Sequence, residues 1–210
     1  SEVHKTDSNT AEMCKLVENA SRDVQIAFAN ELDRICDKAG ISTLELIEMA
    51  NKHPRVNILN PGCGVGGHCI AVDPHFIISK FPAESNIIRM AREVNSYKPL
   101  WCIEKVQSTI AQFEMNYGRS AKIAMMGLAF KPNIDDLRES PAKKITDEIR
   151  SSISEDSLFV SEPNLTEHKN FKLFDCRKAI QEADIIVFLV AHDEFKALEI
   201  AETKIIIDFC

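Results

Sequence analysis

The stretch Ala121-Lys-Ile-Ala-Met-Met-Gly-Leu-Ala-Phe130 is the point at which the hydrophobic pattern of the chain changes. It is a nearly continuous apolar run, which is typical of a strand buried on both faces of a sheet. Downstream of it, strand patterns at 157–161, 184–190 and 204–208 alternate with helical patterns at 140–150, 177–183 and 193–200. This alternation predicts a doubly wound, Rossmann-like parallel sheet over residues 118–210.

Upstream of residue 118 the pattern is helical. A long helix is expected from about Thr10 to Ala39, with Asn9 as its N-cap and Gly40 at its end. Shorter helices are expected at 42–51, at 75–80 behind an Asp73-Pro74 cap, at 84–94, and from Lys98-Pro99 to about 118. We therefore predict an all-helical domain over 1–117, and a long first helix of this kind often serves as a dimer interface.

The composition excludes several classes of protein. The 210 residues are 45% hydrophobic and carry a net charge of -7 with no compensating basic block, which argues against a nucleic-acid binder. Seven scattered cysteines do not form the pattern of a secreted disulfide framework, so a reducing, cytoplasmic setting is expected. No apolar run is long enough to cross a bilayer, and we predict no membrane association.

A glycine-rich loop, Asn60-Pro-Gly-Cys-Gly-Val-Gly-Gly-His-Cys-Ile-Ala-Val-Asp-Pro74, is the densest cluster of reactive residues. Its Gly62-x-Gly64-x-x-Gly67 spacing matches a dinucleotide fingerprint, but Asn60-Pro61 interrupts the strand that should precede such a turn. A metal site from Cys63, His68 and Cys69 lacks a second ligand cluster, so no metal is expected. Two interpretations remain open on composition alone: a catalytic thiol at Cys69 with a carboxylate four residues later, or a buried, inert cysteine.

Polar residues elsewhere are candidates for a site. Lys15 and Asn19 are spaced i, i+4 on one side of the first helix, where a merely solvated face is the alternative. Arg55 is either a surface charge or a phosphate contact. The loop after the first strand carries Lys131 and Arg138, which suit a phosphate or pyrophosphate unless the loop is simply a charged surface turn.

Four stretches of the chain together resemble the UDP-glucose/GDP-mannose dehydrogenase family. They are Ala11–Asn19, the Arg55 segment, the glycine loop through Asp73, and Gly127-Leu-Ala-Phe-Lys-Pro-Asn-Ile-Asp-Asp-Leu-Arg-Glu-Ser-Pro141. The Gly-Gly-His-Cys-Ile form of the glycine loop resembles the branch that acts on UDP-N-acetylhexosamines. The resemblance implies oxidation of the C6 alcohol of a UDP-sugar to a carboxylate in two NAD-dependent hydride transfers.

The resemblance also implies roles for individual residues. Cys69 is expected to be the nucleophile, which holds the aldehyde as a thiohemiacetal and then as a thioester. Lys15 and Asn19 are expected to stabilise the oxyanion, and Asp73 to act as the base for hydrolysis.

The substrate and cofactor contacts are implied in the same way. Arg55, Gly66 and Lys131 are the expected substrate-binding residues, and Arg138 is expected to contact NAD. The family's dimer is built on a long helix, so a homodimer through the first helix is expected.

The chain departs from the family pattern at both ends. No strand-Gly-x-Gly-x-x-Gly-helix unit for NAD precedes residue 10, and no covering helix follows the last strand. We therefore expect a helical dimerisation domain followed by an α/β UDP-sugar-binding domain, truncated at both ends relative to the family and inactive alone. The alternative is a non-catalytic dimerisation or nucleotide-binding module, or the partner of a separately encoded NAD domain.

Overall fold

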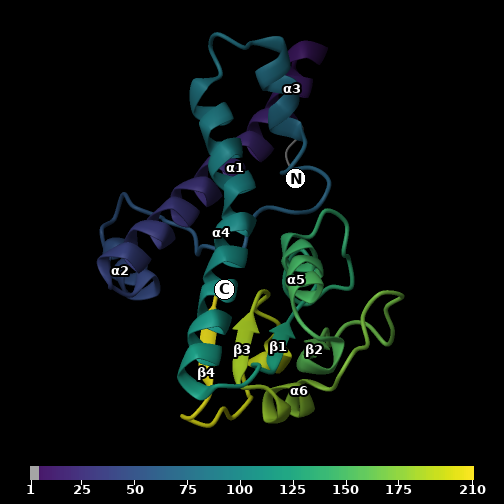
Figure 1. The fold of residues 1–210 in the computed structure, drawn as a ribbon. Helices are drawn as coiled ribbons and strands as arrows, with labels where there is room; N and C mark the ends of the chain where they lie inside the picture. Colours follow the sequence, from purple (N-terminus) through teal and green to yellow (C-terminus); the bar gives the residue numbers. More distant parts are fainter. Residues whose placement is uncertain (1–4) are drawn as a thin grey trace. The chain divides into compact units, whose positions relative to one another are not determined.

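The structure, a computed structural model, describes residues 5–210, which form two compact units (Figure 1). The first unit comprises the residues up to Asn60 together with His68–Asn95, and the second comprises Pro61–Gly67 together with Ser96–Cys210. The sequence pattern predicts that the helical domain ends at residue 117. In the structure, residues 96–117 cluster with the sheet, because their apolar side chains pack into its core.

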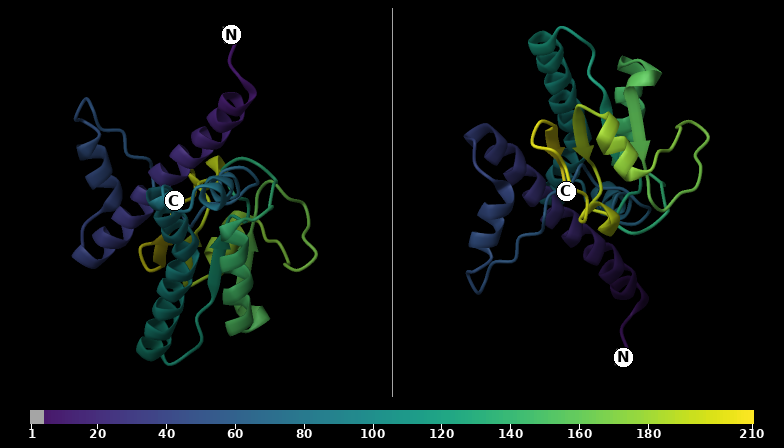
Figure 2. Two further views of the ribbon diagram at one scale, coloured as in Figure 1. Left: turned by 90° about the horizontal axis from the view of Figure 1, so that it is seen from above. Right: turned by 90° about the horizontal axis from the view of Figure 1, so that it is seen from below.

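The first unit is helical, as predicted. It begins with α1 (Ser8–Ala39), whose N-cap is Asp7, and the predicted Asn9 cap is wrong because the Asp7 carboxylate accepts the Thr10 N–H. Gly40 ends the helix in the left-handed conformation, at φ 69°. The chain then turns back and forms α2 (Thr43–Ala50), which lies beside the end of α1 (Figures 1 and 2).

The third helix, α3 (Asp73–Lys80), packs on α1. It begins at Asp73 itself, with Val72 as the N-cap residue and no side-chain cap, so the prediction that Asp73 caps the helix is wrong. Pro74 occupies the first turn, where its missing N–H has no intrahelical partner to lose. The Asp73 carboxylate is thereby left for another hydrogen bond.

A buried polar network holds the core of the first unit together. The Arg92 guanidinium donates to Asp23 Oδ1 at 2.6 Å, and Asn95 Nδ2 donates to the same oxygen at 2.8 Å. Asn30 in turn donates to Asn95 Oδ1 at 2.9 Å. Burial raises the pKa of Asp23, while Arg92 and Asn95 act in the opposite direction. These contacts join α1 to the first part of α4.

The helix α4 (Asn86–Tyr117) is a single helix with Pro99 inside it, so the prediction of two helices separated at Lys98-Pro99 is wrong. Proline disfavours a helix interior but does not forbid it when packing compensates. Such packing is present beyond Pro99, where four apolar side chains of α4 are buried against the sheet: Cys102, Val106, Ile110 and Phe113.

The second unit is built on a four-stranded parallel sheet, which confirms the predicted doubly wound fold. Its order is β2 (Leu158–Ser161), β1 (Ile123–Met126), β3 (Ile185–Phe188) and β4 (Ile205–Asp208). One face packs against α4 and α5 (Pro141–Ser152), and the other against α6 (Cys176–Glu182). Short 3-10 turns occupy Glu155–Ser157 and Asp193–Phe195, so the helix predicted at 193–200 is wrong.

Candidate active site

Asn19 and Asp73 meet in the first unit, although 54 residues separate them in the sequence. The Asn19 amide on α1 donates to Asp73 Oδ2 at 2.5 Å in a partly buried position. Helix packing explains the contact, since α3 begins at Asp73 and lies on α1. The hydrogen bond fixes the direction of the carboxylate.

Cys69 lies one turn before Asp73. Its carbonyl accepts the backbone N–H of Asp73 at 2.8 Å and that of Val72 at 3.1 Å, so the backbone of this turn is fixed against the start of α3. The thiol itself is exposed. The interpretation of Cys69 as a buried, inert cysteine is therefore wrong, whereas Cys63 fits that description.

Cys63 is buried, and its thiol donates to the carbonyl of Leu189 at 3.4 Å. Burial raises the pKa of Cys63 to about 12, which keeps it protonated. In the part of the chain that the structure describes, no group of three histidine, cysteine or acidic side chains is arranged to hold a metal ion.

Lys15 and Arg55 are not brought into contact with Cys69 by any hydrogen bond or ion pair described for residues 5–210. Lys15 lies one turn before Asn19 on α1, is 65% exposed, and pairs with Glu18 at 3.3 Å. Arg55 is exposed in the turn after α2, where its backbone N–H donates to His53 Nδ1 at 3.3 Å. Both side chains are long and exposed, so their positions here do not prevent contact with a ligand.

The glycine-rich part of the loop, Pro61–Gly67, packs against the loop that follows β1, and both belong to the second unit. A Cβ atom on Gly66 would lie 2.7 Å from the carbonyl oxygen of Glu139 and 2.8 Å from Phe130 and Pro141. Gly67, at φ 79°, would meet the Phe130 ring at 2.9 Å, and its N–H donates to the Arg138 carbonyl.

The fingerprint-like spacing of the glycines therefore serves close packing of two loops. No strand precedes it, whereas a dinucleotide-binding turn follows a strand and opens a helix. The loop therefore lacks the strand–turn–helix context of a dinucleotide fingerprint, which disfavours the dinucleotide interpretation.

Lys131 and Arg138 are both exposed on the loop between β1 and α5. The Arg138 guanidinium binds Asp136 through two nitrogens, at 2.6 and 3.0 Å. The hydrogen bonds from Arg138 lower the pKa of Asp136 to about 2. The structure thus brings Lys131, Arg138 and Gly66 to one pair of loops, while Asn19, Cys69 and Asp73 form a separate group in the first unit.

Sequence reasoning missed two residues beside the Lys131 loop. Glu162 and His192 are almost fully buried and bind each other, with Nε2 of His192 at 3.2 Å from Oε2 of Glu162. Both follow parallel strands, Glu162 directly after β2 and His192 a few residues after β3. Their placement after the carboxyl ends of predicted strands was the signal that could have found them.

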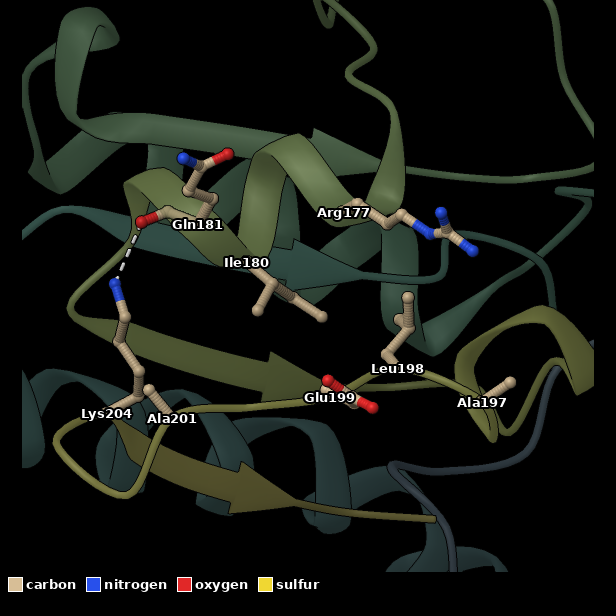
Figure 3. A pocket seen from close by; sticks show the side chains of 8 residues that line it. All are labelled: Arg177, Ile180, Gln181, Ala197, Leu198, Glu199, Ala201 and Lys204. Carbon is tan, nitrogen blue, oxygen red and sulfur yellow. Dashed lines mark hydrogen bonds between the residues drawn. The ribbon is translucent and has the colours of Figure 1, made fainter.

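A surface pocket of about 560 Å³ lies between α6 and the segment before β4 (Figure 3). Lys204, at its rim, donates to the carbonyls of Gln181 and Ala183 and so caps the end of α6. None of the predicted site residues lines this pocket, and Lys204 already has a structural role.

Comparisons with known proteins identify the two units. Residues 9–97 match the central domain of the UDP-glucose/GDP-mannose dehydrogenase family, and residues 124–210 match the UDP binding domain of the same family. The chain belongs to the UDP-glucose/GDP-mannose dehydrogenase family. The resemblance stated from the four sequence stretches is thus confirmed.

Individual members of the family narrow the relationship. The chain is 53% identical over 201 residues to UDP-N-acetyl-D-mannosamine dehydrogenase of Salmonella typhi. It is 47% identical over 211 residues to NDP-N-acetyl-D-galactosaminuronic acid dehydrogenase of Ralstonia solanacearum. A solved structure of UDP-D-ManNAc dehydrogenase from Pyrococcus horikoshii aligns with a TM-score of 0.83 at 37% identity.

The chain spans about half the length of these relatives. The Salmonella typhi match covers 92% of this chain and 48% of the other protein, and the Ralstonia match covers 97% and 48%. The Pyrococcus match covers 97% and 49%. Within residues 5–210, no helix combines the length and apolarity needed to span a bilayer.

Proposed function

We propose that this chain is the substrate-binding and dimerising part of an NAD-dependent UDP-N-acetylhexosamine 6-dehydrogenase. The observation that carries the proposal is the group formed by the exposed thiol of Cys69 and the Asn19–Asp73 hydrogen bond, one turn apart. A nucleophile, a fixed carboxylate and an amide donor are the groups that thioester chemistry at a sugar aldehyde requires.

Two steps are assigned to this chain, one before and one after the second hydride transfer, in which the thiohemiacetal becomes the thioester. In the first, the Cys69 sulfur adds to the C6 aldehyde, and the carbonyl oxygen takes up a proton to give a thiohemiacetal. In the last, water attacks the thioester carbon, the C–S bond breaks, and the carboxylate and the Cys69 thiolate are released. The hydride acceptor of the oxidation is NAD in this family, and no residue of the glycine loop provides a site for it.

Asp73 is assigned as the base that takes the proton from the attacking water. Its hydrogen bond from Asn19 holds one oxygen, which points the carboxylate in a defined direction. Lys15, one turn before Asn19, is assigned to the developing oxyanion, and it must leave Glu18 to do so. Because that ion pair is exposed, its loss costs little.

The UDP moiety is assigned to the second unit, whose family description is a UDP binding domain. Lys131 and Arg138 provide cations beyond the carboxyl end of β1, where ligands of doubly wound sheets bind. The net charge of -7 makes such local cations necessary for a diphosphate. We assign Lys131, Gly66 and Arg55 to the substrate and Arg138 to the cofactor.

The proposed sugar is N-acetyl-D-mannosamine, because the relatives of higher identity are UDP-N-acetyl-D-mannosamine dehydrogenases. The NDP-N-acetyl-D-galactosaminuronic acid dehydrogenase of Ralstonia is 47% identical to this chain, only slightly less than those relatives. UDP-N-acetylgalactosamine is therefore the comparison substrate in any binding experiment.

The test combines binding with chemical protection. We expect UDP-N-acetylmannosamine to bind the chain in a calorimetric titration, and to slow alkylation of Cys69 by iodoacetamide. Cys176 on α6, which belongs to no part of the proposed site, serves as the internal control and should react at an unchanged rate. Absence of binding, or equal protection of both cysteines, would contradict the proposal.

An activity measurement separates this function from full catalysis. With NAD and UDP-N-acetylmannosamine present, we expect no appreciable NADH formation by this chain alone, because its Gly-x-Gly-x-x-Gly stretch does not follow a strand as a dinucleotide-binding turn does. A robust rate would contradict the proposal that this chain binds the sugar nucleotide and that NAD is bound by another domain. Addition of a separate NAD-binding domain from a relative is expected to restore a rate.

The alternative is a non-catalytic module that binds nucleotides or dimerises. The observation in its favour is the ion pair of Lys15 with Glu18, which turns the lysine toward an acid on its own helix. On this alternative, Cys69→Ser would leave the restored rate unchanged. On the proposal, Cys69→Ser abolishes that rate while UDP binding persists.

A further inference from the structure

Four polar side chains form a cluster beyond the carboxyl ends of β1, β2 and β3. Glu162 and His192 are 3% and 0% exposed, and Asn133 and Asn164 surround them. A buried carboxylate is costly unless each of its lone pairs meets a donor. Glu162 is therefore expected to be surrounded by hydrogen-bond donors.

The Glu162 carboxylate accepts hydrogen bonds from three parts of the unit. Oε2 accepts the backbone N–H groups of Leu128 at 2.7 Å and Ala129 at 3.0 Å, together with His192 Nε2 at 3.2 Å. Oε1 accepts the backbone N–H of Asn164 at 3.1 Å. Burial by itself raises the pKa of Glu162, but the donors from His192, Leu128 and Asn164 outweigh it, and the pKa is lowered.

The hydrogen bonds fix the tautomer of His192. The backbone N–H of Asn133 donates to His192 Nδ1 at 3.0 Å, and an N–H can only donate, so Nδ1 carries no proton. The neutral ring then carries its proton on Nε2, which donates to Glu162. The edge of the ring packs against Phe195 at 5.3 Å between ring centres, which fixes its orientation.

These contacts hold the loop after β1 at two points. Leu128 and Ala129 are bound by Glu162 at its start, and Asn133 is bound by His192 further along. The Asn133 side chain also exchanges hydrogen bonds with Asp193, at 2.7 and 3.0 Å. Lys131 lies between the two points, so its backbone is fixed on both sides while its side chain stays exposed.

We propose that Glu162 and His192 are positioning residues that hold the loop carrying Lys131 in the geometry that receives the diphosphate of the nucleotide sugar. The inference rests on the proposed function, because the diphosphate is the ligand that Lys131 is assigned to bind. A plain structural role does not require this arrangement, since a buried apolar pair fills space at equal or lower cost. The two side chains instead direct their acceptors at three backbone amides of one functional loop.

The first experiment uses Glu162→Gln. An amide has one acceptor oxygen, so its NH2 group would face a backbone or imidazole donor and one anchor would be lost. We expect amide hydrogen exchange at Leu128, Ala129 and Asn133 to accelerate, and UDP to bind about tenfold more weakly, the effect of losing one hydrogen bond to a charged group. Glu182→Gln, in an exposed ion pair with Lys122, is the control and should change neither quantity.

A pair of substitutions separates the two nitrogens of His192. Asn at this position retains an acceptor where Nδ1 lies, whereas Gln retains a donor where Nε2 lies. We expect His192→Asn to preserve the protection of the Asn133 amide and the affinity for UDP. We expect His192→Gln to lose both.

The outcomes distinguish this inference from the proposed function. If the wild-type chain does not bind UDP, the proposed function fails, while amide exchange still decides whether the anchors exist. If the wild type binds UDP and both Glu162→Gln and His192→Gln bind it with wild-type affinity, the inference is overturned.

Two measurements on the wild type remain decisive if the variants do not fold. Nitrogen-15 NMR should show the Nε2–H tautomer of His192, and UDP should further protect the Asn133 amide from exchange. A protonated Nδ1, or exchange at Asn133 that UDP does not change, would contradict the inference.

Discussion

At the scale of single residues, the candidate site depends on hydrogen bonds that fix the direction of a charged group. Asn19 holds one oxygen of Asp73, and His192 with three backbone N–H groups holds Glu162. Arg138 is held by Asp136 in the same manner. The Cys69 thiol near Asp73 and the Lys131 amine on the loop held by Glu162 stay exposed. Orientation by a second residue is therefore the common feature of the site.

The pairing of Arg138 with Asp136 predicts an unusual titration. Arg138 lowers the pKa of Asp136 from its ordinary value of 3.8 to about 2. Because the folded-state pKa is the lower one, the contribution of this pair to stability is present above about pH 4 and is lost as the pH falls through about 2. Carboxyl carbon-13 NMR should show the low midpoint, and Arg138→Gln should move it toward 3.8.

The control for this titration is Lys144→Gln, which breaks an exposed ion pair with Glu139 on the same loop. It should leave the midpoint of Asp136 where it is. A wild-type midpoint close to 3.8 would show that the pair does not form in solution.

At the scale of elements, the first unit is held together by the buried network between α1 and α4. Asp23 and Arg92 are paired at 2.6 Å, with side chains that are 0% and 10% exposed. Such a pair contributes little net stability compared with apolar residues, but removal of one partner leaves a buried charge without compensation. The network therefore specifies how α1 and α4 pack.

Asp23→Ala is expected to destabilise the protein by about 3–5 kcal/mol, because Arg92 would stay buried without its partner. Urea denaturation measures this difference in the free energy of unfolding. The double variant Asp23→Leu with Arg92→Met should lose less than Asp23→Ala alone, since neither charge remains. Glu18→Ala, which removes an exposed ion pair with Lys15, should change stability by no more than about 1 kcal/mol.

A loss for Asp23→Ala no larger than that for Glu18→Ala would show that the buried network does not stabilise the helix packing. A double variant less stable than the single one would show that shape rather than charge is limiting at this position.

At the scale of the whole molecule, the first unit presents an apolar surface on α1 and α4. A shallow groove of about 310 Å³ is lined mostly by apolar side chains of both helices, and Phe28, Ile87 and Met90 in it are 53%, 73% and 55% exposed. Contiguous exposed apolar residues mark interaction sites. We assign this surface to the homodimer proposed through α1.

Sedimentation velocity should then show a dimer at about 10 µM chain, a concentration at which a stable interface is occupied. Phe28→Asp is expected to shift the protein to monomer, because it places a charge at an apolar contact. Phe76→Asp on α3, equally exposed but outside the groove, should leave the dimer intact. A monomeric wild type, or dissociation by Phe76→Asp alone, would contradict the assignment.

The sequence by itself determined the helical first part, the parallel sheet and the family. Helical spacing before residue 118 and the alternation of strand and helix patterns after Ala121 are local patterns that can be read over a few residues. The sequence also indicated Cys69 and Asp73, because a potential nucleophile and a carboxylate stand four residues apart in the glycine loop. Local cues failed at Pro99, where packing beyond the proline kept α4 continuous.

Only the tertiary structure decided which side chains meet. It brought Asn19 to Asp73, packed Gly66 against Phe130 and Pro141, and joined Glu162 to His192. The members of each pair lie between 30 and 75 residues apart along the chain, far beyond the reach of helical or strand periodicity. Such contacts depend on how whole elements pack, and hydrophobic patterns specify which face of an element is buried without specifying its neighbour.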